Sequence, residues 1–200
     1  PIPVVCREDL ESVWPPPHKW TKRLILMMHM THWDLSGMTE PIKVDKKLAM
    51  QALKGLGWDD PIPSEDIEAW KERFRQYISL QNLSWNRCII PMDAAEPLHM
   101  KLICCNDGAE EMAGSAVYGC VKRKNGRFSS QLLFSRSRLC TQTIPRNELD
   151  ACVLGAAAAE CVRRALGSKI AEETLFVTDS EIAFCWISNP EKTLKIFVFN

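Results

Sequence analysis

The sequence has no excess of charge of either sign and no long apolar run. Lysine and arginine together number 25, as do aspartate and glutamate, so the whole chain carries no field that would attract nucleic acid or an acidic membrane. The apolar stretch at 23–33 ends in polar residues and is shorter than the roughly 18 residues of a membrane span. We therefore expect no membrane partner, and any nucleic-acid signal must come from local clusters.

The sequence also lacks a C-x-x-C pair and a secretion signal. Its nine cysteines are odd in number and spread from Cys6 to Cys185. This pattern favours free thiols in a reducing compartment over a disulfide framework or a zinc site. Together with the missing signal, it predicts an intracellular protein, in the cytoplasm or the nucleus, that is not secreted.

What is present is the composition of an ordinary globular protein. The 200 residues are 46% hydrophobic and 25% charged, enough to bury a core in one large domain or two small ones. Residues 1–20 contain the proline run "VWPPPHKW", which favours a linker. Residues 21–95 are mainly helix-compatible, with the turn-rich loop "GLGWDDPIP" before a helix at about 64–80.

The pattern changes in residues 96–200, where short apolar runs predict three strands. "NG" at 125–126 is a hairpin signal between the second and third strands. A long apolar helix, "TIPRNELDACVLGAAAAECVRRALG", then leads to "ETLFVTDS", which we interpret as a buried strand, and to a short helix. This order predicts an α/β (α+β) fold, a mixed sheet with packed helices, in which the fourth strand lies parallel to the first.

Three carboxylates fall where such a sheet would gather them. Asp107 follows the first strand, Glu148 opens the long helix and Asp179 closes the fourth strand. Carboxylates at one point repel one another unless a cation lies between them, and Mg²⁺ accepts such oxygen ligands. Each residue also has a structural alternative: "NDG" is a good turn sequence, Glu148 suits a helix dipole, and Asp179 with Ser180 could cap the next helix.

Basic residues gather in one interval that contains no acidic residue, between Glu111 and Glu148. They could hold the phosphates of a polyanion, or they could be the ordinary surface charge of a solvated hairpin. Arg136 and Arg138 alternate with serines, so they share one strand face. The seven candidate nucleic-acid-binding residues are Lys122, Arg123, Lys124, Arg127, Arg136, Arg138 and Arg146.

Four sequence motifs carry a resemblance to a known family. "GWDDPIP", "LLFSRSRL", "TIPRNELDACVLGA" and "LFVTDSEIAFCWI" together resemble the pol polyprotein of BEL/Pao-type LTR retrotransposons. The similar segment runs from the end of the reverse transcriptase into the ribonuclease H domain and covers about residues 21–200. The most specific part is "IPRxEL" before an alanine-rich helix that is followed by "TDS".

The resemblance implies a ribonuclease H fold and hydrolysis of the RNA strand of an RNA–DNA hybrid. It places Asp107, Glu148 and Asp179 on the family's metal-binding acidic positions, with Asp107 as the bridging ligand. Two Mg²⁺ ions, about 4 Å apart and replaceable by Mn²⁺, would be the cofactor. Residues 21–95 would correspond to the helical thumb or connection region of the reverse transcriptase, and the other partners would be the polymerase and integrase of the polyprotein.

The sequence departs from the family's pattern at several points. Ala109 stands where a small polar residue is usual, and Asn147 where an apolar one is. No element after the second helix supplies a fourth acidic ligand, so we expect a domain truncated at its C-terminus. These departures leave open a catalytically inactive nucleic-acid-binding or scaffold remnant, or a structural fragment, as alternatives to a metal-dependent ribonuclease H.

Other candidate groups favour packing over function. Asp59 and Asp60 are a loop pair followed by proline, not the paired aspartates of a polymerase. His29 and His32 lie three residues apart on a possible helix without a companion ligand, so we expect them to be packing residues. We expect the same of the tryptophans at 58, 70 and 85.

Overall fold

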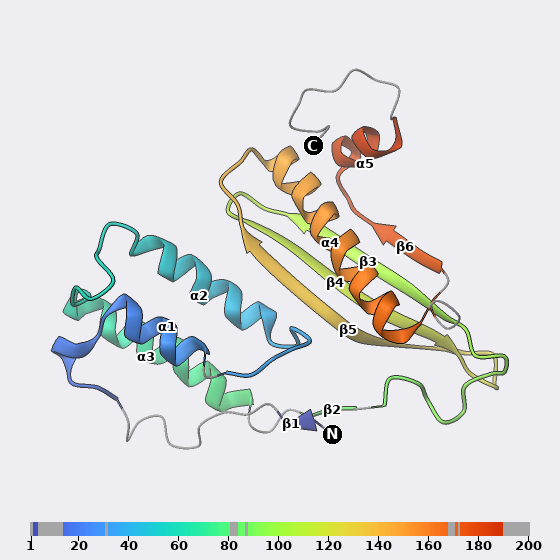
Figure 1. Ribbon diagram of the computed structural model, residues 1–200, viewed down its shortest axis with the longest axis horizontal. Helices are drawn as coiled ribbons and strands as arrows, with labels where there is room; N and C mark the ends of the chain where they lie inside the picture. Colours follow the sequence, from blue (N-terminus) through green and yellow to red (C-terminus); the bar gives the residue numbers. More distant parts are fainter. Residues whose placement is uncertain are drawn as a thin grey trace. The chain divides into compact units, whose positions relative to one another are not determined.

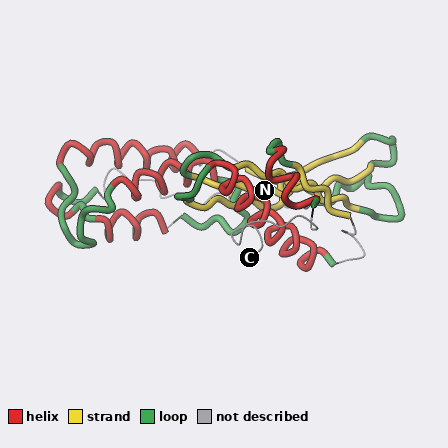
Figure 2. Tube along the Cα trace, turned by 90° about the horizontal axis from the view of Figure 1, so that it is seen from above, coloured by secondary structure: helices red, strands yellow, loops and turns green. Residues whose placement is uncertain are grey.

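The structure, a computed structural model, describes residues 2–3, 14–30, 32–80, 84–86, 88–167, 171 and 173–189 (Figure 1). Contacts divide the chain into two units, which are described separately. Unit 1 comprises Pro1–Leu35 and Thr39–Arg87, and unit 2 comprises Ser36–Met38 and Cys88–Asn200. The long strands all belong to unit 2, as the colours of Figure 2 show.

Unit 1 is built on three helices. They are α1 (Lys22–Met30), α2 (Glu40–Ala52) and α3 (Ser64–Ser79), accompanied by the 3-10 helix η2 (Pro17–Lys19) and by the short antiparallel pair β1 (Ile2–Pro3) and β2 (Ser84–Trp85). Their apolar faces meet in a core that contains Ile25, Trp70 and Phe74. The mainly helical pattern expected before residue 95 is thus present in the described residues.

The proline-rich segment packs on this core rather than standing apart as a linker. Trp20 is fully buried, and the ring of Trp14 lies 5.7 Å from that of Trp20 and 6.2 Å from that of Phe74. The indole nitrogen of Trp20 donates a hydrogen bond to the carbonyl of Pro15. Two large aromatic side chains therefore hold residues 14–20 on the core, because their rings remove a large apolar area from water.

Unit 2 contains a four-stranded mixed sheet in the order β5-β4-β3-β6. The strands are β3 (Met100–Gly108), β4 (Met112–Lys122), β5 (Phe128–Leu139) and β6 (Glu173–Val177). The first three form an antiparallel meander, and Gly126, with φ of 81°, occupies the hairpin turn predicted at "NG". β6 pairs with β3 in parallel, which confirms the predicted mixed sheet and helical crossover.

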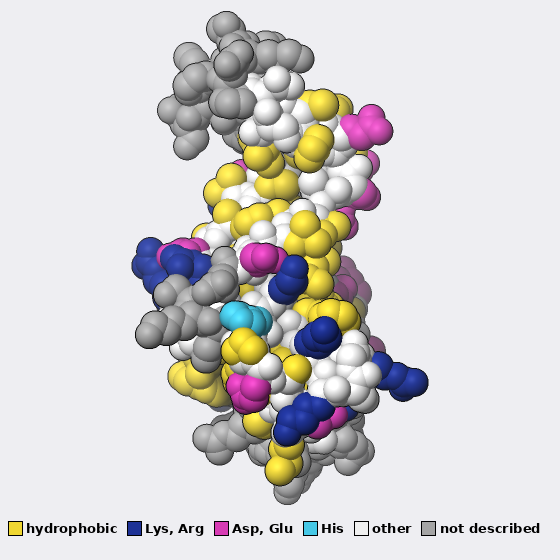
Figure 3. All heavy atoms as spheres, turned by 90° about the vertical axis from the view of Figure 1, so that its right-hand side faces the viewer, with side chains coloured by type: hydrophobic (Ala, Val, Ile, Leu, Met, Phe, Trp, Pro, Cys, Tyr) yellow, Lys and Arg dark blue, Asp and Glu magenta, His cyan; other side chains and the backbone are white. Residues whose placement is uncertain are grey.

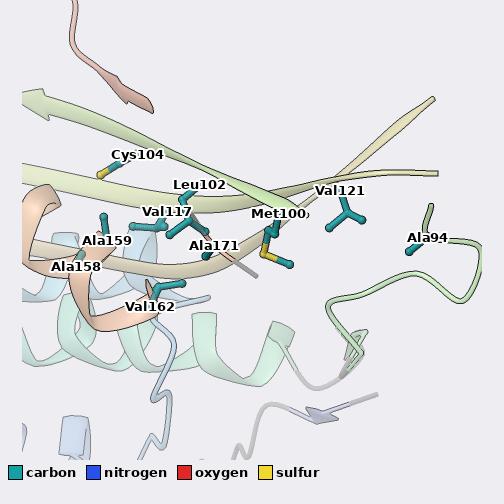
Figure 4. Packing of buried hydrophobic residues seen from close by; sticks show 10 residues of the cluster. All are labelled: Ala94, Met100, Leu102, Cys104, Val117, Val121, Ala158, Ala159, Val162 and Ala171. Atoms are coloured by element: carbon teal, nitrogen blue, oxygen red, sulfur yellow. The ribbon is translucent and has the colours of Figure 1, made fainter. Parts of the chain in front are cut away.

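That crossover is α4 (Ile144–Leu166), which covers one face of the sheet. In Figure 4, Ala158, Ala159 and Val162 of this helix point toward Leu102 and Val117 of the strands. Along β3 every second residue, from Met100 to Gly108, is buried, and α4 packs against this strand. This alternation is the expected result of period-2 side chains over a single helical layer.

β6 differs from the buried strand that its composition predicted. Leu175 and Phe176 are 60% and 51% exposed, and Val177 is also exposed. Apolar side chains also remain exposed on α5 (Glu181–Ser188), and yellow side chains are visible across this side of unit 2 in Figure 3. Within the part of the chain that the structure describes, β6 stands at the edge of the sheet, so composition alone overstated its burial there. The apolar stretch at 192–200 lies outside the described residues.

Candidate metal centre

Three carboxylates converge at one end of the sheet in unit 2. Asp107 projects from β3, Glu148 from α4, and Asp179 from the segment between β6 and α5. One oxygen from each lies within 4.8 Å of the other two. The structure therefore brings together the three acidic residues that the spacing singled out.

The parallel pairing of β3 and β6 explains how the two aspartates meet. Cys105 and Val177 form the last paired positions of the two strands, and each aspartate follows two residues later. Parallel strands end at the same edge, so side chains at equal offsets from a paired position lie next to one another. Both aspartates are exposed to solvent.

Asp107 does not lie in a turn, although "NDG" is a favourable turn sequence. It occupies the strand itself and pairs with Gly114 of β4. Nor is Asp179 the cap of the following helix, since the side chain of Ser180 accepts the hydrogen bond from the backbone of Ala183 at 3.2 Å. The helix dipole stabilises a carboxylate mainly in the first turn of a helix. Glu148 is the fifth residue of α4 and therefore lies just beyond that turn.

Glu148 is the buried member of the cluster, with 8% of its surface exposed. Its Oε2 accepts a hydrogen bond of 3.0 Å from the backbone N–H of Gly108. Burial raises the pKa of Glu148, and the charges of Asp107 and Asp179 raise it further, while the Gly108 hydrogen bond opposes them. The two aspartates therefore repel an ionised Glu148 carboxylate.

Two glycines allow α4 to approach the sheet closely enough to deliver Glu148. A Cβ on Gly108 would overlap the backbone nitrogen of Glu148 and lie 2.5 Å from the carbonyl carbon of Asn147. A Cβ on Gly155 would lie 2.8 Å from Cγ of Asn106. The alanines of α4 contribute to its fit on the sheet, but these two positions set how close it can come.

Two buried asparagines support the acidic residues from neighbouring positions. The Asn106 amide donates to the carbonyls of Cys104 and Val177, at 3.2 Å each, and so ties β3 to β6 just before the aspartates. The Asn147 amide donates to the carbonyl of Ala109 at 2.7 Å. Asn147 and Ala109 both depart from the pattern of the family that the sequence resembles, but nothing in the sequence indicates that they are in contact.

The donor set suits a hard divalent cation. Three carboxylate oxygens are the ligand type that Mg²⁺ and Mn²⁺ prefer, and a cation would offset the repulsion that raises the pKa of Glu148. Asp107, Glu148 and Asp179 are the residues that could hold it. Among the described residues, this is the one group of histidine, cysteine and acidic side chains with such spacing.

The candidate nucleic-acid-binding residues separate into two groups within unit 2. Arg136 and Arg138 pair with Ser115 and Ala113 of β4, at the end of the sheet where Asp107 lies, and Arg146 is in the first turn of α4. The other four surround the β4–β5 hairpin. Gly114 is the partner of Asp107 on β4, and Lys122 lies eight residues further along that strand, or about 26 Å away at roughly 3.3 Å per residue. The four hairpin residues are Lys122, Arg123, Lys124 and Arg127.

Arg136 and Arg138 lie on the face of the sheet that carries α4. Ala113, opposite Arg138, is buried in a cluster with Ala151 of α4, and opposite residues of an antiparallel pair share a face. Arg138 also forms an ion pair of 2.9 Å with Asp150 of the same helix. The two arginines are therefore on the side from which Glu148 enters the acidic cluster.

The two histidines are partly buried and pack against Tyr77 of the unit 1 core, as expected of packing residues. The ring of His32 stacks on Tyr77 at 4.3 Å, and Nδ1 of His29 shares a hydrogen bond of 2.9 Å with the hydroxyl of the same tyrosine. Asp59 lies in a loop, as predicted, and forms an ion pair of 2.7 Å with Arg23.

The three tryptophans differ from one another in burial. Trp70 is 2% exposed and belongs to the core of unit 1. Trp85 is partly buried in β2. Trp58 is 51% exposed, with the Lys22 amine 5.0 Å from its ring centre, so the prediction that it packs in a core was wrong.

Comparison with known proteins agrees with this fold. The chain matches the family described as Pao retrotransposon-like RNaseH-like domain over residues 21–180. A search of curated proteins finds no match. No helix among the described residues has the length and apolar character needed to cross a bilayer. The match spans most of the sequence and both units, and the chain therefore belongs to the Pao retrotransposon-like RNaseH-like domain family.

Proposed function

We propose that this chain is a metal-dependent ribonuclease H of a retrotransposon polyprotein, which hydrolyses the RNA strand of RNA–DNA hybrids. Family membership supports a ribonuclease H-like role on nucleic acid within a polyprotein. The observation that carries the catalytic part is the meeting of Asp107, Glu148 and Asp179 within 4.8 Å. Three separate elements supply these residues, which favours a built site over a chance surface cluster.

The three residues have distinct roles in this proposal. Asp107, Glu148 and Asp179 would together hold the cations, with Asp107 as the shared ligand and with Glu148 and Asp179 each on one side. Bound Mg²⁺ or Mn²⁺ would supply an activated water and would neutralise charge on the scissile phosphate. The Gly108 N–H orients the Glu148 carboxylate, and the parallel pairing of β3 and β6 holds the two aspartates side by side.

The hybrid would bind through basic side chains at both ends of the sheet. Arg136, Arg138 and Arg146 lie near the acidic cluster, where they would contact phosphates next to the cleaved bond. Lys122, Arg123, Lys124 and Arg127 would contact the duplex at the hairpin. A spacing of about 26 Å is less than the length of a hybrid of ten or more base pairs, so one hybrid could engage both groups.

Unit 1 would act as the helical region that grips the hybrid and spaces the ribonuclease H site from a polymerase. In this proposal residues 21–95 correspond to the thumb or connection region, and residues 96–200 to the ribonuclease H-like domain. The polymerase and integrase regions of the polyprotein would be its other partners. All eight described cysteines are free, which fits action in the reducing cytoplasm or nucleus.

A cleavage assay tests the catalytic proposal. The full chain is incubated with an end-labelled RNA–DNA hybrid and Mg²⁺ or Mn²⁺, beside Asp107→Asn and the control Glu110→Gln. The control removes a nearby exposed charge that is not in the acidic cluster. We expect cleavage by the wild type and the control, and a reduction of at least about 100-fold in Asp107→Asn, as for removal of one charged group that stabilises a transition state.

The same assay identifies the alternative function. If neither wild type nor Asp107→Asn cleaves the hybrid, but both bind it, the chain is a catalytically inactive nucleic-acid-binding remnant. Cleavage that survives in Asp107→Asn would show that a contaminating nuclease or another site is responsible.

A further inference from the structure

Asn147 is a fully buried polar residue at the start of α4, directly before Glu148. Its side-chain amide donates hydrogen bonds to the carbonyls of Ala109 at 2.7 Å and Glu110 at 3.0 Å. A third carbonyl, that of Gln142, lies at 3.4 Å. An amide group has two hydrogens to donate, so both are used in these hydrogen bonds.

The three carbonyls belong to the two chain segments from which the acidic residues project. Ala109 and Glu110 form the connection that leaves β3 immediately after Asp107 and Gly108. Gln142 lies two residues before the first residue of α4, in the connection from β5. One side chain therefore joins the end of β3 to the start of α4 at the point where Asp107 and Glu148 must meet.

Packing alone does not account for an amide at this position. The Asn147 Oδ1 is buried and has no hydrogen-bond partner in the described part of the chain. A buried polar atom without a partner destabilises the folded state, whereas leucine, whose side chain has the same branching, would carry no such cost. The amide hydrogens are thus what distinguishes asparagine from an apolar residue here.

We propose that in this chain Asn147, which stands where the family usually has an apolar residue, is a positioning residue of the acidic centre, and that its amide holds Asp107 and Glu148 at the separation at which they bind a divalent cation. The inference rests on the proposed function, because it takes the cluster to be a cation site. Asn147 does not touch the cation or the substrate in this scheme. It acts through the backbone of residues 109–110 and through the first turn of α4.

The test compares cation affinity with stability in two variants of the full chain. Asn147→Leu removes the amide, and Val162→Ala weakens the same helix 14 residues beyond Glu148, about 21 Å away at 1.5 Å per residue. Mn²⁺ affinity is measured by electron paramagnetic resonance, and thermal unfolding by circular dichroism. We expect Asn147→Leu to bind Mn²⁺ about 10- to 100-fold more weakly, the usual effect of removing a group that orients a ligand.

In this experiment Val162→Ala should lower the melting temperature and leave Mn²⁺ affinity at the wild-type value. Asn147→Leu with wild-type affinity, or an equal reduction of affinity in Val162→Ala, would overturn the inference and leave the proposed function standing. A wild-type chain that binds no Mn²⁺ would overturn both.

A second measurement on the wild-type chain covers the case in which Asn147→Leu does not fold. Nuclear magnetic resonance follows the side-chain amide of Asn147 and the backbone amide of Gly108 during a Mg²⁺ titration. If Asn147 is coupled to the cation site, both resonances shift with the same midpoint. A Gly108 signal that shifts while the Asn147 amide stays unchanged would contradict the inference.

Discussion

The carboxylate of Glu148 accepts a hydrogen bond of 3.0 Å from the backbone N–H of Gly108, although the two residues lie 40 positions apart in the chain. This bond joins the helix that carries one acidic residue to the strand that carries another. It places Glu148 beside Asp107 and Asp179, whose charges oppose its ionisation. The contact therefore keeps an anion in a place that is unfavourable unless a cation is also present.

Glu148→Gln should stabilise the protein in metal-free buffer at pH 7. Burial and the two aspartates raise the pKa of Glu148 above 4.5, so the folded state favours its protonated form. The stability that protonated Glu148 contributes to the folded state is complete below pH 4.5 and is lost as the pH rises through the raised pKa. Glutamine removes one repelling charge, which is worth about 1 kcal/mol at 4 Å in water, or about 2 to 4 °C in melting temperature.

Calorimetry in EDTA at pH 7 and pH 4 measures this effect. The advantage of Glu148→Gln should shrink at pH 4, and millimolar Mg²⁺ should stabilise the wild type more than the variant, because a ligand that binds the folded state stabilises it. Glu110→Gln serves as the control and should show no such difference. A Glu148→Gln protein less stable than wild type at pH 7 in EDTA would contradict the repulsion described.

Gly108→Ala should destabilise unit 2 by about 1 to 3 kcal/mol, the usual range for overpacking. The added methyl group would overlap the backbone of Glu148, which cannot move without lifting the start of α4 from β3. Gly114→Ala is the matched control on β4, since its Cβ would have the backbone oxygen of Asp107 at 4.0 Å as its nearest neighbour. Urea unfolding followed by circular dichroism distinguishes the two, and equal stabilities would show that the helix does not approach so closely.

Arg136→Ala should weaken hybrid binding and make it less dependent on salt. A protein that neutralises one phosphate fewer has a slope of log affinity against log salt that is shallower by roughly 0.7 to 0.9. Arg138→Ala should have a smaller effect, because Arg138 already pairs with Asp150 at 2.9 Å. Fluorescence anisotropy with a labelled hybrid over a range of salt concentrations measures both slopes. Equal slopes for wild type and Arg136→Ala would remove this arginine from the interface.

His29→Gln should make unit 1 less sensitive to acid. Burial and nearby lysines lower the pKa of His29 from 6.5 to about 4, so its contribution to stability is complete above pH 6.5 and is lost as the pH falls toward 4. Between pH 7 and pH 4.5 the free energy of unfolding therefore falls by about 2 kcal/mol, since a shift of one pKa unit corresponds to about 1.4 kcal/mol. The variant should lack this loss.

Tryptophan fluorescence during urea unfolding measures the difference, since six of the seven tryptophans lie in unit 1. The comparison is between the pH dependence of the wild type and that of His29→Gln, because carboxylates titrate in both proteins. Identical losses of stability in the two would show that His29 is not responsible.

Local patterns predicted most elements of unit 2. Short apolar runs predicted β3, β4 and β5, "NG" predicted the turn at Gly126, and the alanine-rich run predicted α4. The spacing of the acidic residues, taken with the parallel pairing, also predicted that they would meet. These predictions succeeded because side-chain period and turn chemistry depend on neighbours in the sequence.

The predictions that failed concern surroundings that lie far away in the chain. "NDG" is a good turn sequence, yet Asp107 lies in a strand that pairs with β4 along one edge and with β6 along the other. β6 has a buried strand's composition but stands at the edge of the sheet that the described strands form. Residues 14–20 contain a proline run, yet Trp20 is fully buried. In each case the position of the segment in the tertiary structure, and not its local preference, decided the outcome.

The sequence by itself determined which residue types were available and in what order along the chain they occur: an aspartate after an apolar strand, a glutamate near the start of a long helix, and a second aspartate after another strand. Only the tertiary structure decided that their oxygens lie within 4.8 Å and that Asn147 joins the segments that carry them. The physical reason is that these distances depend on how closely α4 packs on the sheet, and that closeness is set by Gly108 and Gly155 meeting backbone and side chains remote in sequence.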